Sequence, residues 1–151
     1  MIGPSRFVLV LLFALMFVAV AVAVEPSAEP EDAVEAAQPT IRVALSFGLA
    51  IDRETRSLVS PQEHFAAENF SATEGRVYCL SRVQNMSPPA TLTHVWYHEG
   101  KTMARVDLPI GSADWRTWSS KRILPAWTGQ WEVKVLDDSG MVLATSGFVV
   151  D

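Results

Sequence analysis

The chain has 151 residues and a formal net charge of −5, with a single cysteine. This length allows one folded domain once an export segment and a linker are set aside. The acidic excess lies in residues 25–40, and the part of the chain that follows is nearly neutral. Nucleic-acid binding needs a net basic surface, so we expect no nucleic-acid partner. A single cysteine also excludes an intrachain disulfide.

The N-terminal residues predict an export signal. Arg6 precedes an uninterrupted apolar run from Phe7 to Val24, and Ala21-Val22-Ala23 has the small-x-small pattern of a signal-peptidase site. We therefore assign residues 1–23 to a signal peptide. The alternative is an uncleaved signal anchor, because a run of about 17–25 apolar residues spans a bilayer. In either case the domain is exported, and it is periplasmic or anchored to the inner membrane facing the periplasm.

Residues 24–40 predict a flexible linker. They are rich in glutamate, alanine and proline and contain no cation. Such a composition buries too little apolar surface to offset the entropy lost on ordering. The folded domain is therefore expected to comprise residues 41–151.

Alternation of apolar and polar residues predicts the strands of this domain. The first run continues from Ile41 to Asp52 and predicts one half-buried strand. Ser60-Pro61-Gln62-Glu63 has the spacing of a capping box and predicts a short helix to Asn69, with His64 on its surface. Six further strands are predicted over residues 77–84, 91–98, 102–110, 116–123, 130–136 and 141–149. This pattern predicts an all-β, immunoglobulin-like antiparallel β-sandwich of about seven strands, with Trp96 as a candidate core tryptophan.

Three motifs carry a family resemblance. They are Thr93-His94-Val95-Trp96-Tyr97, then Trp115-Arg116-Thr117-Trp118-Ser119-Ser120-Lys121, then Trp127-Thr128-Gly129-Gln130-Trp131 followed by Asp137-Asp138-Ser139-Gly140. In this order they resemble the bacterial domain-of-unknown-function family numbered twenty-nine-fourteen, over most of Val43 to Val149. Asp52-Arg53-Glu54 resembles an Asp-Arg-Glu-Pro stretch of that family, although Thr55 replaces the proline. The resemblance implies a C-terminal domain of a bacterial exported or membrane protein and implies no activity.

The chemistry-bearing residues predict neither catalysis nor metal binding. Cys79 falls inside a predicted strand, where we expect a buried small hydrophobe. His94 and His98 are four residues apart, which on a strand separates them by about 13 Å, too far to chelate one ion. Ser119 and Lys121 share a strand face, so a Ser-Lys dyad remains the enzyme alternative, without a base and orienting acid to complete it. We expect no catalytic residues, no metal and no cofactor.

The stretch from Trp115 to Arg122 is the candidate ligand-binding site. In an extended strand Trp115, Thr117, Ser119 and Lys121 face one way, and Arg116, Trp118, Ser120 and Arg122 face the other. Each face carries one tryptophan, and we predict that Trp118 is buried and Trp115 is exposed beside Lys121. Exposed indole next to Arg116, Lys121 and Arg122 can stack on sugar rings or receive anionic glycan or peptide groups. The alternative is that the stem of Arg116 or Arg122 covers the exposed indole.

Together these features predict an exported, non-catalytic binding or interaction module of the bacterial cell envelope. Its partner would be an envelope protein or a glycan, and it would meet the membrane only through its N-terminal segment. The alternative is an envelope hydrolase or metal-dependent enzyme with an unrecognised site. A cleft with perturbed pKa values would favour the enzyme, and an exposed Trp/Arg face without a deep cleft would favour binding.

Overall fold

The computed structural model describes residues 40–71 and 75–151, and in this part of the chain the fold is all-β, as predicted. The predicted export helix and linker lie outside the described residues. No helix within the described ranges is long and apolar enough to cross a membrane. The elements are β1 (Arg42–Gly48), β2 (Ala50–Asp52), β3 (Ser57–Val59), β4 (His64–Phe65), the 3-10 helix η1 (Ala67–Asn69), β5 (Arg76–Gln84), β6 (Ala90–His98), β7 (Lys101–Ile110), β8 (Asp114–Arg122), β9 (Gly129–Leu136) and β10 (Val142–Val150).

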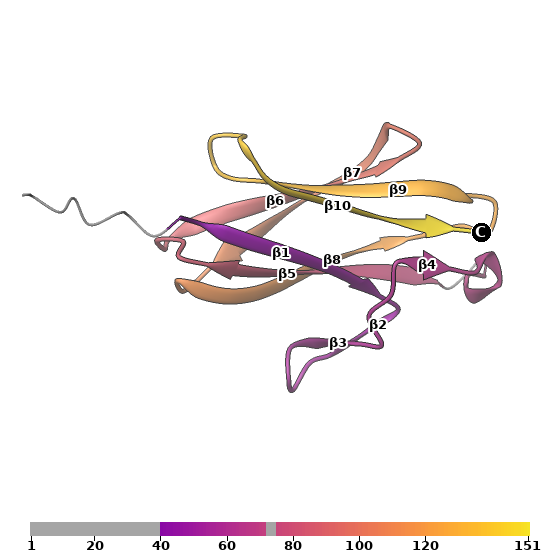
Figure 1. The fold of residues 1–151 in the computed structure, drawn as a ribbon, viewed down its shortest axis with the longest axis horizontal. Coiled ribbons are helices and arrows are strands. Elements are labelled where there is room, and N and C mark those ends of the chain that lie inside the picture. The colour runs from indigo at the N-terminus through magenta and orange to yellow at the C-terminus, as the bar shows by residue number, and fades with distance from the viewer. Residues whose placement is uncertain (1–39, 72–74) are drawn as a thin grey trace, which may run out of the picture. The chain divides into compact units, whose positions relative to one another are not determined.

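The strands form two main sheets. One has the order β1-β5-β8, and the other has the order β4-β10-β9-β6-β7. Every pairing within them is antiparallel except that of β4 with β10, which is parallel. Figure 1 shows the two sheets as facing layers, with the β2–β3 hairpin outside the three-stranded sheet. The outer face of that sheet therefore has a neighbouring segment of its own chain.

Aromatic side chains from both sheets fill the space between them. The rings of Phe47 on β1 and Phe148 on β10 lie 5.0 Å apart between centroids. Trp131 on β9 stacks on Phe148 with an interplanar angle of 5°. Trp96 is fully buried and meets Phe148 edge-on, so its prediction as a core tryptophan is confirmed. Cys79 on β5 is also buried in this core, as expected for a small hydrophobe.

The prediction of a single strand from Ile41 to Asp52 is wrong. The strand β1 ends at Gly48, and the chain then leaves the sheet to form β2 of the separate hairpin. Gly48 lies close to the hairpin, since a Cβ built there would be 3.0 Å from the Leu58 side chain. Alternation reports which face a residue occupies but not which strand it pairs with, so it continues across this break.

The helix predicted to end at Asn69 is also wrong, apart from the short η1. Phe65 is fully buried, and β4 pairs with the C-terminal strand. The backbone of Val149 donates to Glu63, and that of Asp151 donates to Phe65. Pairing with a distant strand thus satisfies backbone groups that a helix would have satisfied locally. His64 consequently lies exposed on a strand, not on a helix.

Candidate functional site

The register of β8 with β5 fixes the two faces of the Trp115–Arg122 stretch. Trp115 lies opposite the fully buried Val83, whereas Trp118 lies opposite Leu80 on the outer face. The predicted division of the stretch into two alternating sets is confirmed. The inner set is Trp115, Thr117, Ser119 and Lys121, and the outer set is Arg116, Trp118, Ser120 and Arg122.

The prediction that Trp118 is the core-facing tryptophan is wrong. Trp115 packs against the core cluster that contains Val83 and Met86, and Trp118 lies on the outside of the sheet. Both side chains are half-buried. The polar neighbours Ser119 and Lys121 on the face of Trp115 do not require solvent there. Ser119 is bonded inside the core, and Lys121 lies near the end of the strand.

An arginine from the β2–β3 hairpin contacts both tryptophans. The guanidinium carbon of Arg56 lies 4.6 Å from the Trp115 ring centroid and 6.0 Å from that of Trp118. Arg56 also donates a hydrogen bond to the carbonyl of Arg116, and Arg116 donates to the carbonyl of Thr55 at 3.5 Å. The hairpin and β8 therefore hold one another through reciprocal arginine contacts. The cation over these indoles is Arg56, not Arg116 or Arg122 as the sequence suggested.

Three arginines line a cleft beside this contact, which we call the arginine cleft. It has a volume of about 460 Å³ and is lined by Arg56, Arg82, Ser112, Asp114, Trp115 and Arg116. The arginines come from the hairpin, from β5 and from β8, so only the tertiary structure brings them together. A volume of this size is typical of small-ligand sites, which span about 300–1,000 Å³.

Asp114 is the one carboxylate that lines the arginine cleft. Its Oδ2 atom lies 3.0 Å from a terminal guanidinium nitrogen of Arg82, and both side chains are about half exposed. The hydrogen bond from Arg82 lowers the pKa of Asp114, and the same bond raises the pKa of Arg82. Asp114 is therefore ionised at neutral pH, and three guanidinium groups against one carboxylate leave the cleft with a net positive charge.

The outer face of the three-stranded sheet carries like charges in register. Arg82 is directly opposite Arg116, and Arg76 is directly opposite Arg122. The pair of Leu80 and Trp118 lies between them. Like charges directly opposite each other on a sheet are destabilising. Contacts within the domain offset this repulsion, since Arg82 pairs with Asp114, Arg116 donates to the carbonyl of Thr55 and Arg76 donates to Ser120.

Lys121 lies apart from the arginine cleft. Its ammonium is 5.4 Å from the ring centroid of Trp127, which packs near His98 and the buried Trp131. The structure therefore divides the five predicted ligand-binding residues. Trp115 and Arg116 line the arginine cleft, Trp118 and Arg122 lie on the outer face, and Lys121 belongs to an aromatic cluster on the inner side. Arg56 and Arg82 were not predicted as site residues, because both are remote from this stretch along the chain.

Ser119 takes part in a buried hydrogen-bond network. Its Oγ atom lies 2.8 Å from His94 Nδ1 and accepts a hydrogen bond from Trp96 Nε1, while His94 Nε2 lies 2.7 Å from Ser81 Oγ. Burial lowers the pKa of His94 to about 4. His94 and Ser81 have no solvent exposure, so the network links the two sheets and gives no positive sign of catalysis.

The histidines do not form a metal site in the described part of the chain. His94 is bonded to two serines, whereas His98 stacks on Trp131 and contacts the carbonyl of Thr128. Within residues 40–71 and 75–151, no three His, Cys, Asp or Glu side chains are grouped so as to hold an ion.

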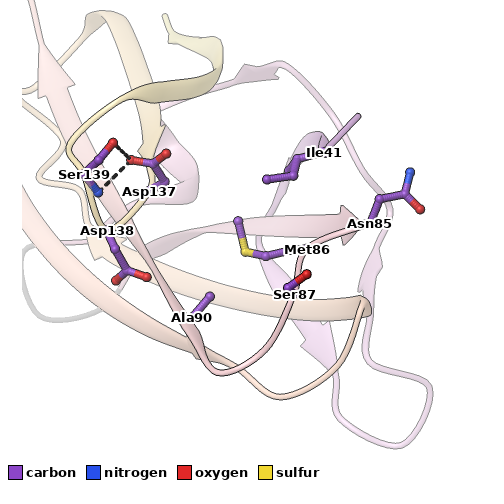
Figure 2. Close-up of a pocket in the computed structure, with 8 residues that line it drawn as sticks. All are labelled: Ile41, Asn85, Met86, Ser87, Ala90, Asp137, Asp138 and Ser139. Atoms are coloured by element: carbon purple, nitrogen blue, oxygen red, sulfur yellow. Dashed lines mark hydrogen bonds between the residues drawn. The ribbon is translucent and has the colours of Figure 1, made fainter. Parts of the chain in front are cut away.

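A second cavity, of about 480 Å³, lies where β1 begins, between the β5–β6 and β9–β10 turns (Figure 2). Its walls include Ile41, Met86 and Ala90, with Asp137 and Asp138 on the opposite side. The Asp137 carboxylate accepts hydrogen bonds from Ser139 and Met141, so it closes its own turn. This cavity is lined by two carboxylates and no cation, whereas the arginine cleft is lined by three cations and one carboxylate.

The comparison with protein families agrees with the resemblance seen in the sequence. Residues 89–150 match the family described as "Protein of unknown function (DUF2914)". The DUF2914 match contains all of β6 to β10 and the three tryptophan motifs, but it does not include Asp52-Arg53-Glu54. It also contains Asp114, Trp115 and Arg116 but neither Arg56 nor Arg82, so the arginine cleft joins matched and unmatched segments. No curated protein matches this chain.

Proposed function

We propose that this protein is an exported, non-catalytic binding module of the bacterial cell envelope and that the arginine cleft is its binding site. The observation that carries the proposal is the gathering of Arg56, Arg82 and Arg116 around one accessible cleft with a single carboxylate. Cationic side chains exposed in a concave surface recruit anionic partners from solution. The partner is an envelope glycan or protein, and the protein contacts the membrane only through its N-terminal segment.

We propose that the domain is an immunoglobulin-like sandwich, which is a common frame for binding surfaces. Three strands face a second sheet in which β10, β9, β6 and β7 are neighbours. The buried Trp96 on β6 occupies the core between the sheets, as the tryptophan of such folds does. The inter-sheet disulfide of antibody domains has no counterpart, because Cys79 is the only cysteine.

The export part of the proposal rests on the sequence. Arg6, the apolar run to Val24 and the Ala-x-Ala pattern have the order of a signal peptide or signal anchor. The absence of catalysis is proposed because Ser81 and Ser119, the serines that contact the His94 imidazole, are both bonded within the buried core network. A nucleophile must instead reach its substrate from an open site.

Position-specific photo-crosslinking in intact cells tests the proposal. A photoreactive residue is introduced at Ser112, which lines the arginine cleft, and at Thr145, which is exposed on β10 of the other sheet. We expect a discrete high-mass adduct from position 112 that disappears when Arg82→Gln and Arg116→Gln are added. Equal adducts from both positions, or none from position 112, would contradict a binding role for the cleft.

A further inference from the structure

We propose that the glycan is the partner of the arginine cleft and that the cleft binds a phosphate monoester carried on one of its sugars. This inference rests on the proposed binding function and narrows its ligand to one chemical class. The cleft has both the charge and the donor arrangement that this class requires.

The charge of the cleft matches a dianion. Arg56, Arg82 and Arg116 contribute three positive charges, and Asp114 neutralises one of them. The remaining charge of about +2 complements a phosphate monoester, which carries about −1.5 to −2 at pH 7. A single carboxylate supplies only half of this charge and would leave one guanidinium without a counter-charge.

The donors of the three arginines are only partly used by the protein. Each guanidinium has five N–H donors in a planar fork. Arg56 donates to the carbonyl of Arg116, Arg116 donates to that of Thr55, and Arg82 donates to Asp114. Every one of these arginines therefore retains further N–H groups, and the acceptor oxygens of a phosphate can take several at once.

The contacts of the protein also hold the arginines in place before a ligand arrives. Arg56 is fixed against Trp115 and Trp118, and Arg82 is fixed by Asp114. A preorganised guanidinium loses less side-chain entropy on binding than a free one. The half-buried Trp115 forms part of the wall, and the cleft volume of about 460 Å³ exceeds that of a phosphate group, so it accommodates part of the molecule that carries it.

Calorimetric titration of the purified full chain with glucose 6-phosphate tests the proposal, with glucose and glucuronate as matched ligands lacking the phosphate. We expect binding of glucose 6-phosphate only. The affinity should rise several-fold between pH 5 and pH 7.5, because the second phosphate proton dissociates at about pH 6. The Arg82 contact holds the pKa of Asp114 below its usual value, so the carboxylate of the cleft stays ionised over this range. Equal affinity for glucuronate would overturn the assignment to a dianion.

Substitutions locate the binding. Arg82→Gln and Arg116→Gln should each weaken binding about 10- to 100-fold, the range for a lost charge-assisted hydrogen bond. Asp114→Asn should tighten binding, since it removes the competing carboxylate. Arg105→Gln, on the exposed part of β7 in the other sheet, removes the same charge and should leave affinity unchanged. An equal loss in Arg105→Gln would mean that only the overall charge matters and would overturn the site, and thermal melts exclude variants that fail to fold.

Two further comparisons test the source of the phosphate and the proposed binding function separately. Vesicles containing phosphatidic acid present the same monoester on a lipid surface, and their binding in preference to glucose 6-phosphate would overturn the sugar as the source of the phosphate. If no phosphate compound binds but the position-112 adduct is still lost in the arginine variants, the assignment of the ligand as a phosphate would be overturned. The proposed function as a binding module would stand. Absence of both phosphate binding and the position-112 adduct would overturn the inference and the proposed function together.

Discussion

His94 should make the stability of this domain fall in mild acid. The imidazole is fully buried between the two sheets, with a serine hydroxyl on each ring nitrogen. Burial lowers its pKa from 6.5 to about 4. The folded protein therefore keeps His94 neutral, whereas the unfolded chain takes up a proton below about pH 6.5. Acidification between pH 6.5 and pH 4 thus favours unfolding, and the effect levels off below pH 4.

The size of the effect follows from the two pKa values. A difference of about 2.5 pKa units corresponds to about 3.4 kcal/mol between the ends of this range. At pH 4.5 most of this difference is already lost, so the free energy of unfolding should be about 2.5 kcal/mol lower than at pH 7.5 through His94 alone. This is a large fraction of the 5–15 kcal/mol that is typical of a domain.

Urea unfolding at pH 7.5 and pH 4.5 measures the effect. The variant His94→Gln removes the titrating group while keeping a donor and an acceptor, and its loss between the two pH values should be smaller than that of the unmodified protein by about 2.5 kcal/mol. His64→Gln is the matched control, because His64 is exposed on β4. The pKa values of Asp52, Asp114 and Asp137 are lowered, so the stability that they contribute is lost as the pH falls from about 5 downward. These carboxylates are present in all three proteins, so the comparison between variants cancels their contribution.

The reasoning would be refuted if His94→Gln and the unmodified protein lost the same free energy of unfolding between pH 7.5 and pH 4.5. That result would mean that the folded domain admits a proton to His94 without opening. A smaller loss in His64→Gln, with no reduction in His94→Gln, would move the pH sensitivity to the surface.

Three other predictions concern packing and processing. Trp115→Ala should lower the free energy of unfolding, measured with urea, by about 3 kcal/mol, and Trp118→Ala should lower it distinctly less. The reason is that Trp115 packs against the core and Trp118 lies outside it, and the reverse order would contradict the register of β8. Gly147→Ala should lower the melting temperature, because a Cβ there would lie 2.5 Å from the carbonyl oxygen of Trp131, and an unchanged melt would show that the strand can shift at no cost. Mass spectrometry of the exported protein should find Val24 at its N-terminus, whereas recovery of intact Met1 in the membrane fraction would support the anchor.

The candidate site was only partly predictable from the sequence. Alternation within β8 correctly divided the stretch into two faces, because that division depends only on the geometry of a strand. It did not reveal which face was the core, since that depends on the neighbouring β5 and on the opposite sheet. The polarity of Ser119 suggested solvent, but the serine is satisfied by His94 and Trp96 from the other sheet. The sequence around a serine does not show whether its hydroxyl bonds to a buried partner or to water.

Net charge was a similarly incomplete guide. The near neutrality of the domain is a property of its sequence, but the gathering of arginines on one face is a property of its fold. Arg56, Arg82 and Arg116 are far apart in the chain. The pairing of β5 with β8 places Arg82 opposite Arg116, and the β2–β3 hairpin, which packs outside the three-stranded sheet, adds Arg56 (Figure 1). No periodicity in the sequence records such a meeting.

The sequence by itself determined the all-β class, the six strands from β5 to β10 and the family resemblance of the C-terminal part. These features follow from local alternation, turn residues and short motifs, which act over a few residues. The tertiary structure alone decided where β1 ends, that residues around Phe65 form a strand instead of a helix, and which arginines share a cleft. Each of those outcomes depends on pairing with a segment distant in the chain, where long-range hydrogen bonding and burial override local propensity.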